Sequence, residues 1–169
     1  TSAFSIKIAA ENNIKSLGFA SDNLHGPNTC NDEKIKNLIE ECSYYKIESV
    51  LLTRHHTIKE LIKQIDFTKP KTISCSYQFS KNELQVLRKT FKKLKIGIAI
   101  NPENFNMKYL KSIKKIINII YYDMNVYKAK SIKTYALVKS LKQIKYIKSL
   151  SIPVFVGGGI NENKAKKII

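Results

Sequence analysis

The 169 residues are enough for one sizeable hydrophobic core, and 43% hydrophobic with 25% charged residues excludes a disordered chain. No segment approaches the roughly 18 consecutive apolar residues of a membrane-spanning helix, so we expect no membrane partner. The formal net charge is +17 at pH 7, but lysines are spread along the chain, so we expect attraction for anionic small molecules and no nucleic-acid partner.

Six short apolar runs, rich in β-branched residues, recur along the chain at nearly regular intervals. They are too short for helices and are typical of buried parallel strands. The intervals leave room for one helix between successive strands, as in repeated βα units. The runs cover residues 16–20, 49–53, 72–76, 95–100, 116–123 and 152–156.

Amphipathic segments with helix-start signals separate these runs. Asn31 precedes two acidic residues, which the helix dipole favours in a first turn. Thr57 precedes a second apolar stripe, and Ser80 with Glu83 has the spacing of a capping box. Residues 131–150 predict a long amphipathic helix. Strands and helices are therefore expected to alternate along the chain.

Strict alternation leaves two architectures, an open doubly wound sheet or a (β/α)8 barrel. A dinucleotide-binding open sheet would carry G-x-G-x-x-G after an early strand, and the sequence has no such motif. The glycine cluster instead follows the last strand, where barrels bind phosphate. We predict an α/β fold of the (β/α)8 TIM-barrel type with parallel strands, in a single domain over residues 1–169.

The chain is short for a closed barrel, which needs at least about 200 residues. About six βα units are recognisable, so we expect the barrel to be truncated at both ends. Missing first and last strands would leave open sheet edges, and we therefore expect the chain to be poorly stable or sticky alone.

The active site of a barrel lies at the carboxyl ends of its strands, and two features stand there. Gly157, Gly158 and Gly159 follow a strand directly, so their amides could approach a phosphate closely, although a tight turn is the alternative. Asp123 ends another hydrophobic run, where a carboxylate suits acid–base catalysis, although it could also simply cap the loop.

The three cysteines and three histidines predict no metal site. The cysteines form no C-x-x-C pair, and their odd number without a secretion signal fits a reducing cytoplasm. The adjacent pair His55-His56 points in different directions along any regular element and is not joined by carboxylates. We expect a cytoplasmic protein that needs neither metal nor cofactor.

The order of four segments carries a family resemblance. Residues 9–19 read AAENNIKSLGF, and Gly26-Pro27-Asn28 follow in the next loop. Asp123 ends a strand, and residues 153–163 read PVFVGGGINEN. In this order the segments resemble the first helix, the second strand with its loop, the end of the sixth strand and the phosphate segment of phosphoribosylanthranilate isomerase, a barrel enzyme of tryptophan biosynthesis.

The resemblance implies an intramolecular oxidoreductase, an aldose–ketose isomerase that performs the Amadori rearrangement of N-(5-phosphoribosyl)anthranilate. Asp123 would be the general acid, and Gly157, Gly158 and Gly159 would bind the substrate phosphate. The family's general base is a cysteine in a K-x-C-G segment, which this sequence lacks. Where the family often has S-x-R-Y after its second strand, with the arginine meeting the anthranilate carboxylate, this chain has His25-Gly26-Pro27-Asn28. Arg54, at the end of the next strand, could supply the missing cation.

Other readings remain open from the residues. One is another phosphate-binding barrel enzyme, similar to thiamine-phosphate synthase or a pentulose-phosphate epimerase, although acidic or histidine metal ligands are scarce. Another is a degenerate barrel that binds a phosphorylated ligand without catalysis. In each case the partner is a small phosphorylated molecule, and we expect a monomer or a homodimer.

Overall fold

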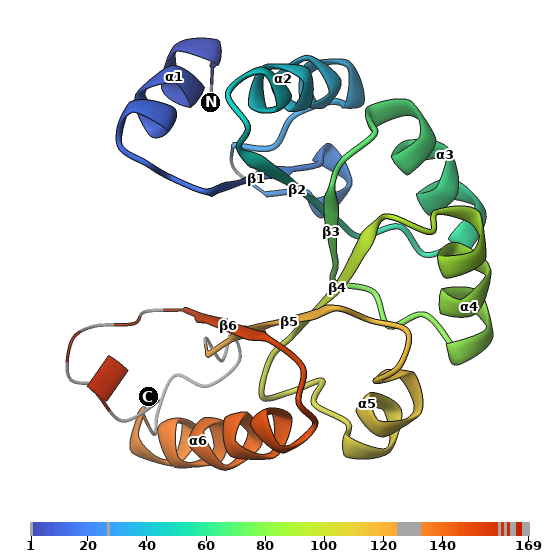
Figure 1. Ribbon diagram of the computed structural model, residues 1–169. Helices are drawn as coiled ribbons and strands as arrows, with labels where there is room; N and C mark the ends of the chain where they lie inside the picture. Colours follow the sequence, from blue (N-terminus) through green and yellow to red (C-terminus); the bar gives the residue numbers. More distant parts are fainter. Residues whose placement is uncertain are drawn as a thin grey trace. The chain divides into compact units, whose positions relative to one another are not determined.

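The computed structural model describes residues 2–26, 28–124 and 133–158, together with residues 160, 162, 165 and 166. Strands and helices alternate along the chain (Figure 1). The chain falls into two compact units, Thr1–Ile96 (unit 1) and Gly97–Ile169 (unit 2).

Unit 1 contains three parallel strands and the start of a fourth. Strand β1 pairs with β2, placing Gly18 opposite Val50, and β2 pairs with β3, placing Thr53 opposite Cys75. The elements of unit 1 are α1 (Ala3–Glu11), β1 (Ser16–Ala20), a 3₁₀ turn (Asp22–Leu24), α2 (Asp32–Tyr44), β2 (Glu48–Thr53), α3 (Ile58–Thr68), β3 (Thr72–Cys75), α4 (Lys81–Thr90) and the first residues of β4 (Lys95–Ile100).

The predicted helix starts of unit 1 are confirmed. The Asn31 side chain accepts a hydrogen bond from the Lys34 amide at the start of α2. The Thr57 hydroxyl does the same at the start of α3, and Ser80 with Glu83 forms a complete capping box on α4. Because each cap satisfies amides that the helix leaves unpaired, each stabilises its helix by about 1 kcal/mol.

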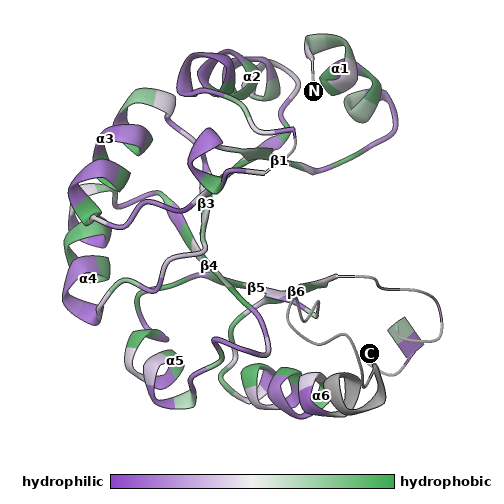
Figure 2. Ribbon diagram, turned by 180° about the vertical axis from the view of Figure 1, so that it is seen from behind, coloured by the Kyte–Doolittle hydropathy of each residue, from purple (hydrophilic) through white to green (hydrophobic). Residues whose placement is uncertain are grey.

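Helices α2, α3 and α4 lie on the same side of the unit 1 strands in both ribbon views. Each of these helices carries both hydrophilic and hydrophobic residues (Figure 2). Their apolar faces meet the strands in a core whose central members are fully buried. These members include Ile35, Leu51, Leu61, Ile73, Leu84 and Leu87. Burial of each such side chain contributes about 1.5–3 kcal/mol, which holds the helices against the strands.

Unit 2 is built around β5, which pairs in parallel with β4 on one side and with β6 on the other. Helix α6 packs on the face that carries Tyr122, because the Tyr122 hydroxyl and the Gln143 side chain are hydrogen-bonded. Its elements are the rest of β4, α5 (Met107–Ile113), β5 (Ile119–Asp123), α6 (Lys133–Ser149) and β6 (Val154–Gly157).

The predicted strand bounds hold for β1 and β4 and differ by one residue at β2 and β3. They are wrong for β6, predicted at 152–156 and observed at Val154–Gly157, and at the start of β5. Ile116 and Ile117 are buried, but their amides donate to the Ile113 carbonyl in the turn that ends α5. An apolar run shows burial without distinguishing a buried turn from a strand, so the run at 116–123 was predicted three residues too long. The first two residues of the helix predicted at 131–150 lie outside the described residues.

The strand order is β1-β2-β3-β4-β5-β6, identical to the order along the chain. A doubly wound sheet has a point where this order reverses, so the topology is that of the barrel type. Within the described ranges, no helix is long and apolar enough to cross a membrane.

Candidate active site

The carboxyl ends of β5 and β6 bring two predicted site residues together in unit 2. Asp123 and Gly157 are register partners at the ends of these neighbouring strands, and the Met124 amide donates to the Gly157 carbonyl at 2.9 Å. Asp123 is half-buried and Gly157 is exposed. The predicted acid therefore lies directly beside the first glycine of the predicted phosphate segment.

Gly157 and Gly158, the two described glycines of this segment, differ in the structural reason for having a glycine. A Cβ atom added at Gly157 would meet no heavy atom within 4 Å, so packing does not require a glycine there. Gly158 has a φ of 86°, which L side chains rarely adopt. Open space at Gly157 and this backbone conformation at Gly158 suit close approach of a ligand to the main chain. Gly159 lies outside the described residues.

The sheet face that carries Asp123 also carries an aromatic pair. Side chains two residues apart on a strand share a face, so Tyr121 lies below Asp123 and Phe155 lies below Gly157. The two rings stack at 5.7 Å between centroids, and Phe155 is 61% exposed. A carboxylate, a glycine and a planar apolar surface therefore share the face opposite to α6.

In unit 1 the strand ends are occupied by a hydrogen-bond network of their own. The Asn23 side chain donates to Thr53 at the end of β2, and Thr53 donates to the buried Gln64 of α3 at 2.7 Å. Gln64 in turn donates to Ser21, after β1, and to Asp32 of α2 at 2.6 Å. These polar groups satisfy one another and fix the loops, so they have a structural role.

Arg54 and Asn28 both lie in unit 1. The Arg54 amide donates to the Asn23 side chain at 3.0 Å, and its exposed guanidinium has no partner among the described residues. Asn28 is exposed with a φ of 63°, a conformation that asparagine tolerates better than most residues. Loop geometry therefore accounts for Asn28, and substrate contacts of both residues stay predictions.

The buried cysteines cannot serve as bases at neutral pH. Cys75 ends β3 and is 1% exposed, and burial raises its pKa to about 12. Burial, reinforced by the charge of Glu41, raises the pKa of Cys42 to about 11. Both thiols stay protonated, whereas a base needs the thiolate. Among the described residues, no group of three His, Cys, Asp or Glu side chains could hold a metal ion.

Neither a scan against protein-family models nor a search of curated proteins found a match. Among solved structures, the phosphoribosyl anthranilate isomerase from Thermococcus kodakaraensis is 11% identical, with 99% of this chain and 80% of that chain covered at a TM-score of 0.73. The N-(5'-phosphoribosyl)anthranilate isomerase from Pyrococcus furiosus is 19% identical, with 97% and 78% covered at 0.69.

These likenesses show the fold. The chain has the (β/α) barrel fold of these isomerases, so the predicted fold class is confirmed, and the resemblance seen in the sequence is confirmed for the fold. A citrate synthase named SbnG is also similar, at 9% identity and a TM-score of 0.71, with 98% of this chain and 77% of that chain covered. The fold is therefore shared with an enzyme of a different name, and the chemistry has to be argued from the site.

Two features of the strand ends were not predicted from the sequence. Gln64 lies three residues after Leu61 on the buried face of α3, and a polar residue in an apolar stripe is the signal that could have revealed the network. The second feature is His55, whose Nε2 atom is buried without a hydrogen-bond partner in the described part of the chain. The adjacent His56 packs edge-on against Tyr77.

Proposed function

We propose that the chain acts in tryptophan biosynthesis as a phosphoribosylanthranilate isomerase, catalysing the Amadori rearrangement of N-(5-phosphoribosyl)anthranilate. The observation that carries the proposal is the register pairing of Asp123 with Gly157 at the ends of β5 and β6. A proton donor beside a phosphate-binding main chain is what ring opening of a phosphorylated sugar needs. The similar isomerase structures support the choice among barrel chemistries.

In this proposal each part of the unit 2 site has a separate task. The amides of the glycine segment bind the phosphate, because a main chain without Cβ atoms lets an anion approach closely. The Asp123 carboxyl protonates the ribose ring oxygen and opens the ring. The stacked Tyr121 and Phe155 rings offer an apolar surface for the aromatic part of the substrate.

The buried cysteines of this chain cannot act as the general base that the isomerase family takes from a cysteine. Cys42 and Cys75 are protonated in the core, and the K-x-C-G segment is absent from the sequence. The proposal therefore assigns the acid and the phosphate site to this chain and makes no assignment for the group that removes the C2 proton.

The test is to follow loss of substrate fluorescence with the purified chain and with Asp123→Asn. We expect the wild-type rate to exceed that of the variant by about 10²-fold or more, since a positioned general acid contributes about 10²–10⁴-fold. The control is Glu40→Gln on the exposed surface of α2, which should leave the rate unchanged. Substrate binding without turnover in all three proteins would instead indicate a non-catalytic phosphate-ligand binder.

Arg54 is proposed as the cation that meets the substrate carboxylate. Its guanidinium has no intramolecular partner among the described residues, so the charge is available. Arg54→Ala should raise KM by more than about tenfold, because a charge-assisted hydrogen bond contributes about 1.5–3 kcal/mol. An unchanged KM would remove Arg54 from the site. Asn28→Ala tests the neighbouring loop in the same assay.

A further inference from the structure

A pocket of about 730 Å³ lies in unit 1, at the end of the strands opposite to the Ser21–Thr53–Gln64 network. Glu48 begins β2, Lys71 immediately precedes β3 and Lys95 begins β4, so the pocket opens at the amino ends of these strands. Its volume falls within the range of about 300–1,000 Å³ that is usual for small-molecule sites. The site proposed above does not use it.

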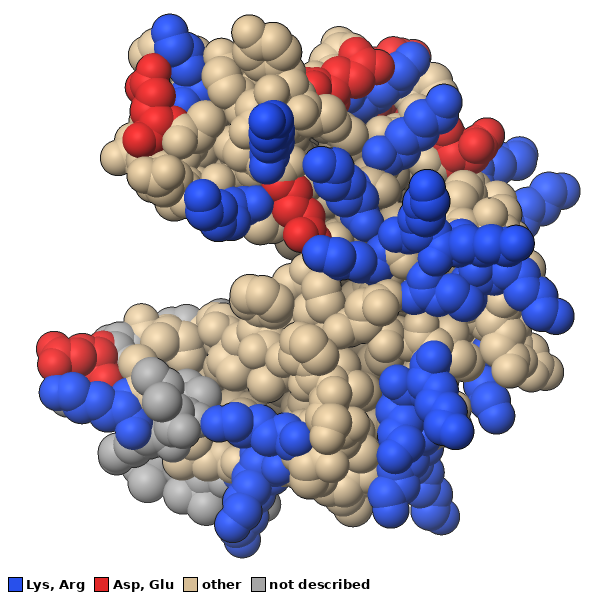
Figure 3. Space-filling view, in the orientation of Figure 1, with Lys and Arg blue, Asp and Glu red and all other residues tan. Residues whose placement is uncertain are grey.

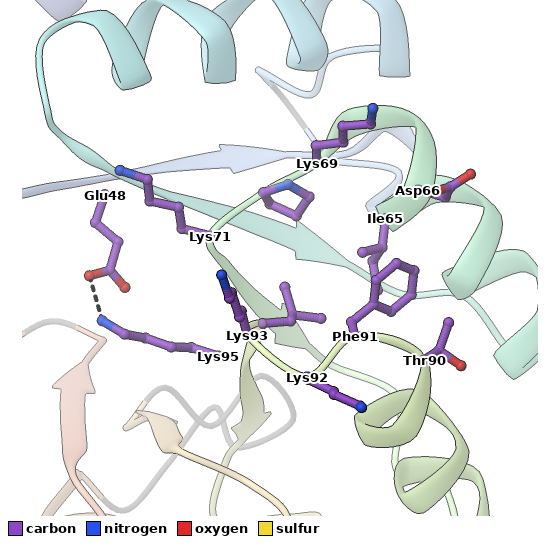
Figure 4. A pocket seen from close by; sticks show the side chains of 12 residues that line it. Glu48, Ile65, Asp66, Lys69, Lys71, Thr90, Phe91, Lys92, Lys93 and Lys95 are labelled. Atoms are coloured by element: carbon purple, nitrogen blue, oxygen red, sulfur yellow. Dashed lines mark hydrogen bonds and ion pairs between the residues drawn. The ribbon is translucent and has the colours of Figure 1, made fainter.

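The pocket carries an excess of positive charge. Five lysines and two carboxylates line it, and Glu48 is already paired with Lys95 at 2.8 Å. In the close view, Lys71, Lys93 and Lys95 extend toward the Glu48 side of the pocket (Figure 4). The lining lysines are Lys69, Lys71, Lys92, Lys93 and Lys95.

This excess is not neutralised within the described chain. Lys69, Lys92 and Lys93 have no carboxylate within ion-pair distance among the described residues. Lys and Arg side chains are spread over the visible face of both units, so charge alone does not distinguish the pocket (Figure 3). What distinguishes the pocket is an apolar wall on one side and the Lys71 and Lys93 side chains extending on the other.

The apolar wall is formed by Ile65 and Phe91, which lie together on the side of the pocket away from Glu48 (Figure 4). Ile65 is 2% exposed and belongs to the core, whereas the Phe91 ring is half-exposed beside it. A flat aromatic side chain packs favourably on another ring or planar group. The pocket therefore presents cations to one part of a ligand and an apolar surface to another.

The pocket wall is held in place by the main chain. The Lys95 amide donates to the Lys71 carbonyl at 3.0 Å, and the Lys71 backbone amide donates to the Ser49 hydroxyl. On the far wall, the Arg88 guanidinium donates to the Leu94 carbonyl at 2.6 Å. A wall that is ordered before binding loses little conformational entropy when a ligand arrives.

We propose that this pocket binds a small phosphate monoester of an aromatic or other planar apolar group. Lys71 and Lys93, which extend toward the same side of the pocket, favour a dianion over a monoanion, because each additional negative charge interacts with the same cations. The Ile65–Phe91 wall favours an ester with a ring over inorganic phosphate. The inference is independent of the proposed isomerase activity, since none of the residues Asp123, Gly157 and Gly158 lines the pocket.

The test uses the ¹⁵N-labelled full chain, titrated with phenyl phosphate and followed by backbone amide shifts. We expect saturable shifts at residues 69, 71 and 91–95, and an affinity at least about tenfold above those of inorganic phosphate and of phenol, because only the ester places both a dianion and a ring in the pocket. Shifts confined to Asp123 and Gly157 would assign the binding to the proposed active site and overturn the inference. Equal affinities for benzoate and phenyl phosphate would overturn the preference for a dianion.

Two variants of equal charge separate a built site from general attraction. Lys71→Gln/Lys93→Gln should weaken phenyl phosphate binding at least about tenfold, because two charge-assisted contacts are lost. The matched control, Lys34→Gln/Lys59→Gln, removes two exposed lysines of unit 1 outside the pocket and should change the affinity less than about twofold. Equal weakening by both pairs would show that only the net charge attracts the anion.

Discussion

The carboxyl ends of the strands are organised differently in the two units. In unit 1 they are occupied, because Gln64 joins the ends of β1 and β2 to α3. In the middle of β1, a Cβ atom added at Gly18 would lie 2.8 Å from the terminal methyl of Leu52, which would have to shift. In unit 2 the glycine at the end of β6, Gly157, faces open space. Polar and glycine residues of the strands therefore serve packing in unit 1, whereas the strand-end glycine of unit 2 is available to a ligand.

The largest effect expected from this difference is in thiol reactivity within unit 1. If the end of β3 is filled, Cys75 should react with a disulfide reagent at pH 7.5 at least about 10²-fold more slowly than the half-exposed Cys30, because burial disfavours the thiolate. Cys42 should be similarly slow. The measurement is the time course of thiol release, with Cys30→Ser as the variant that removes the fast phase.

Fast release from Cys75 in the Cys30→Ser protein would contradict this picture. It would mean that the end of β3 opens readily, so that the unit 1 strand ends are as accessible as those of unit 2.

The next effect in size concerns Gln64, which joins the strand ends of unit 1. Gln64→Leu should lower the free energy of unfolding by about 2–4 kcal/mol, because it removes the hydrogen bonds of Gln64 with the buried Ser21 and Thr53 hydroxyls and the half-buried Asp32 carboxylate. Urea denaturation measures this loss. The same substitution at the exposed Gln85 of α4 should change stability by less than about 0.5 kcal/mol. Equal effects at both positions would show that the network is not a source of stability.

The two glycines give the most direct comparison between the units. Gly18→Ala should destabilise the chain by about 1 kcal/mol, because the terminal methyl of Leu52 must shift to admit the Cβ atom. Gly157→Ala should cost less than about 0.5 kcal/mol, yet weaken phosphate binding at the proposed active site by obstructing the main chain. Thermal unfolding and phosphate-ester titration of both variants separate the two roles. A large stability loss at Gly157 with unchanged phosphate affinity would make that glycine structural as well.

The sequence predicted those parts of this organisation that depend on local signals. The caps at Asn31, Thr57 and Ser80 each depend on a pattern of about four consecutive residues, which the sequence shows directly. The sequence also predicted Asp123 and Gly157 at strand ends. Their pairing in register was not predictable residue by residue, because it depends on which strands are neighbours. A local signal exists for Gln64, which is a polar residue in the apolar stripe of α3. The partners of Gln64 and the lysine pocket depend on tertiary contacts between segments far apart in the chain, so the sequence does not predict them.

The smallest effect concerns the amino ends of the unit 1 strands, where Glu48 meets Lys95. Burial acts to raise the pKa of Glu48, but hydrogen bonds from Lys95 and Thr72 and the charges of Lys95 and Lys71 outweigh it, so the pKa lies below 4.5. A lowered folded-state pKa contributes stability that is present above the unfolded-state value and is lost as the pH falls through the folded-state value.

Glu48→Gln should therefore cost about 0.5–1 kcal/mol at pH 7, a value reduced by solvent screening of the half-exposed Lys95, and the cost should vanish toward pH 3. Urea denaturation at the two pH values measures this, and a cost that persists in acid would assign the effect to packing. Because the substitution also frees Lys95, it should tighten phenyl phosphate binding to the pocket. Stability and affinity should thus change in opposite directions, which loss of folding alone cannot produce.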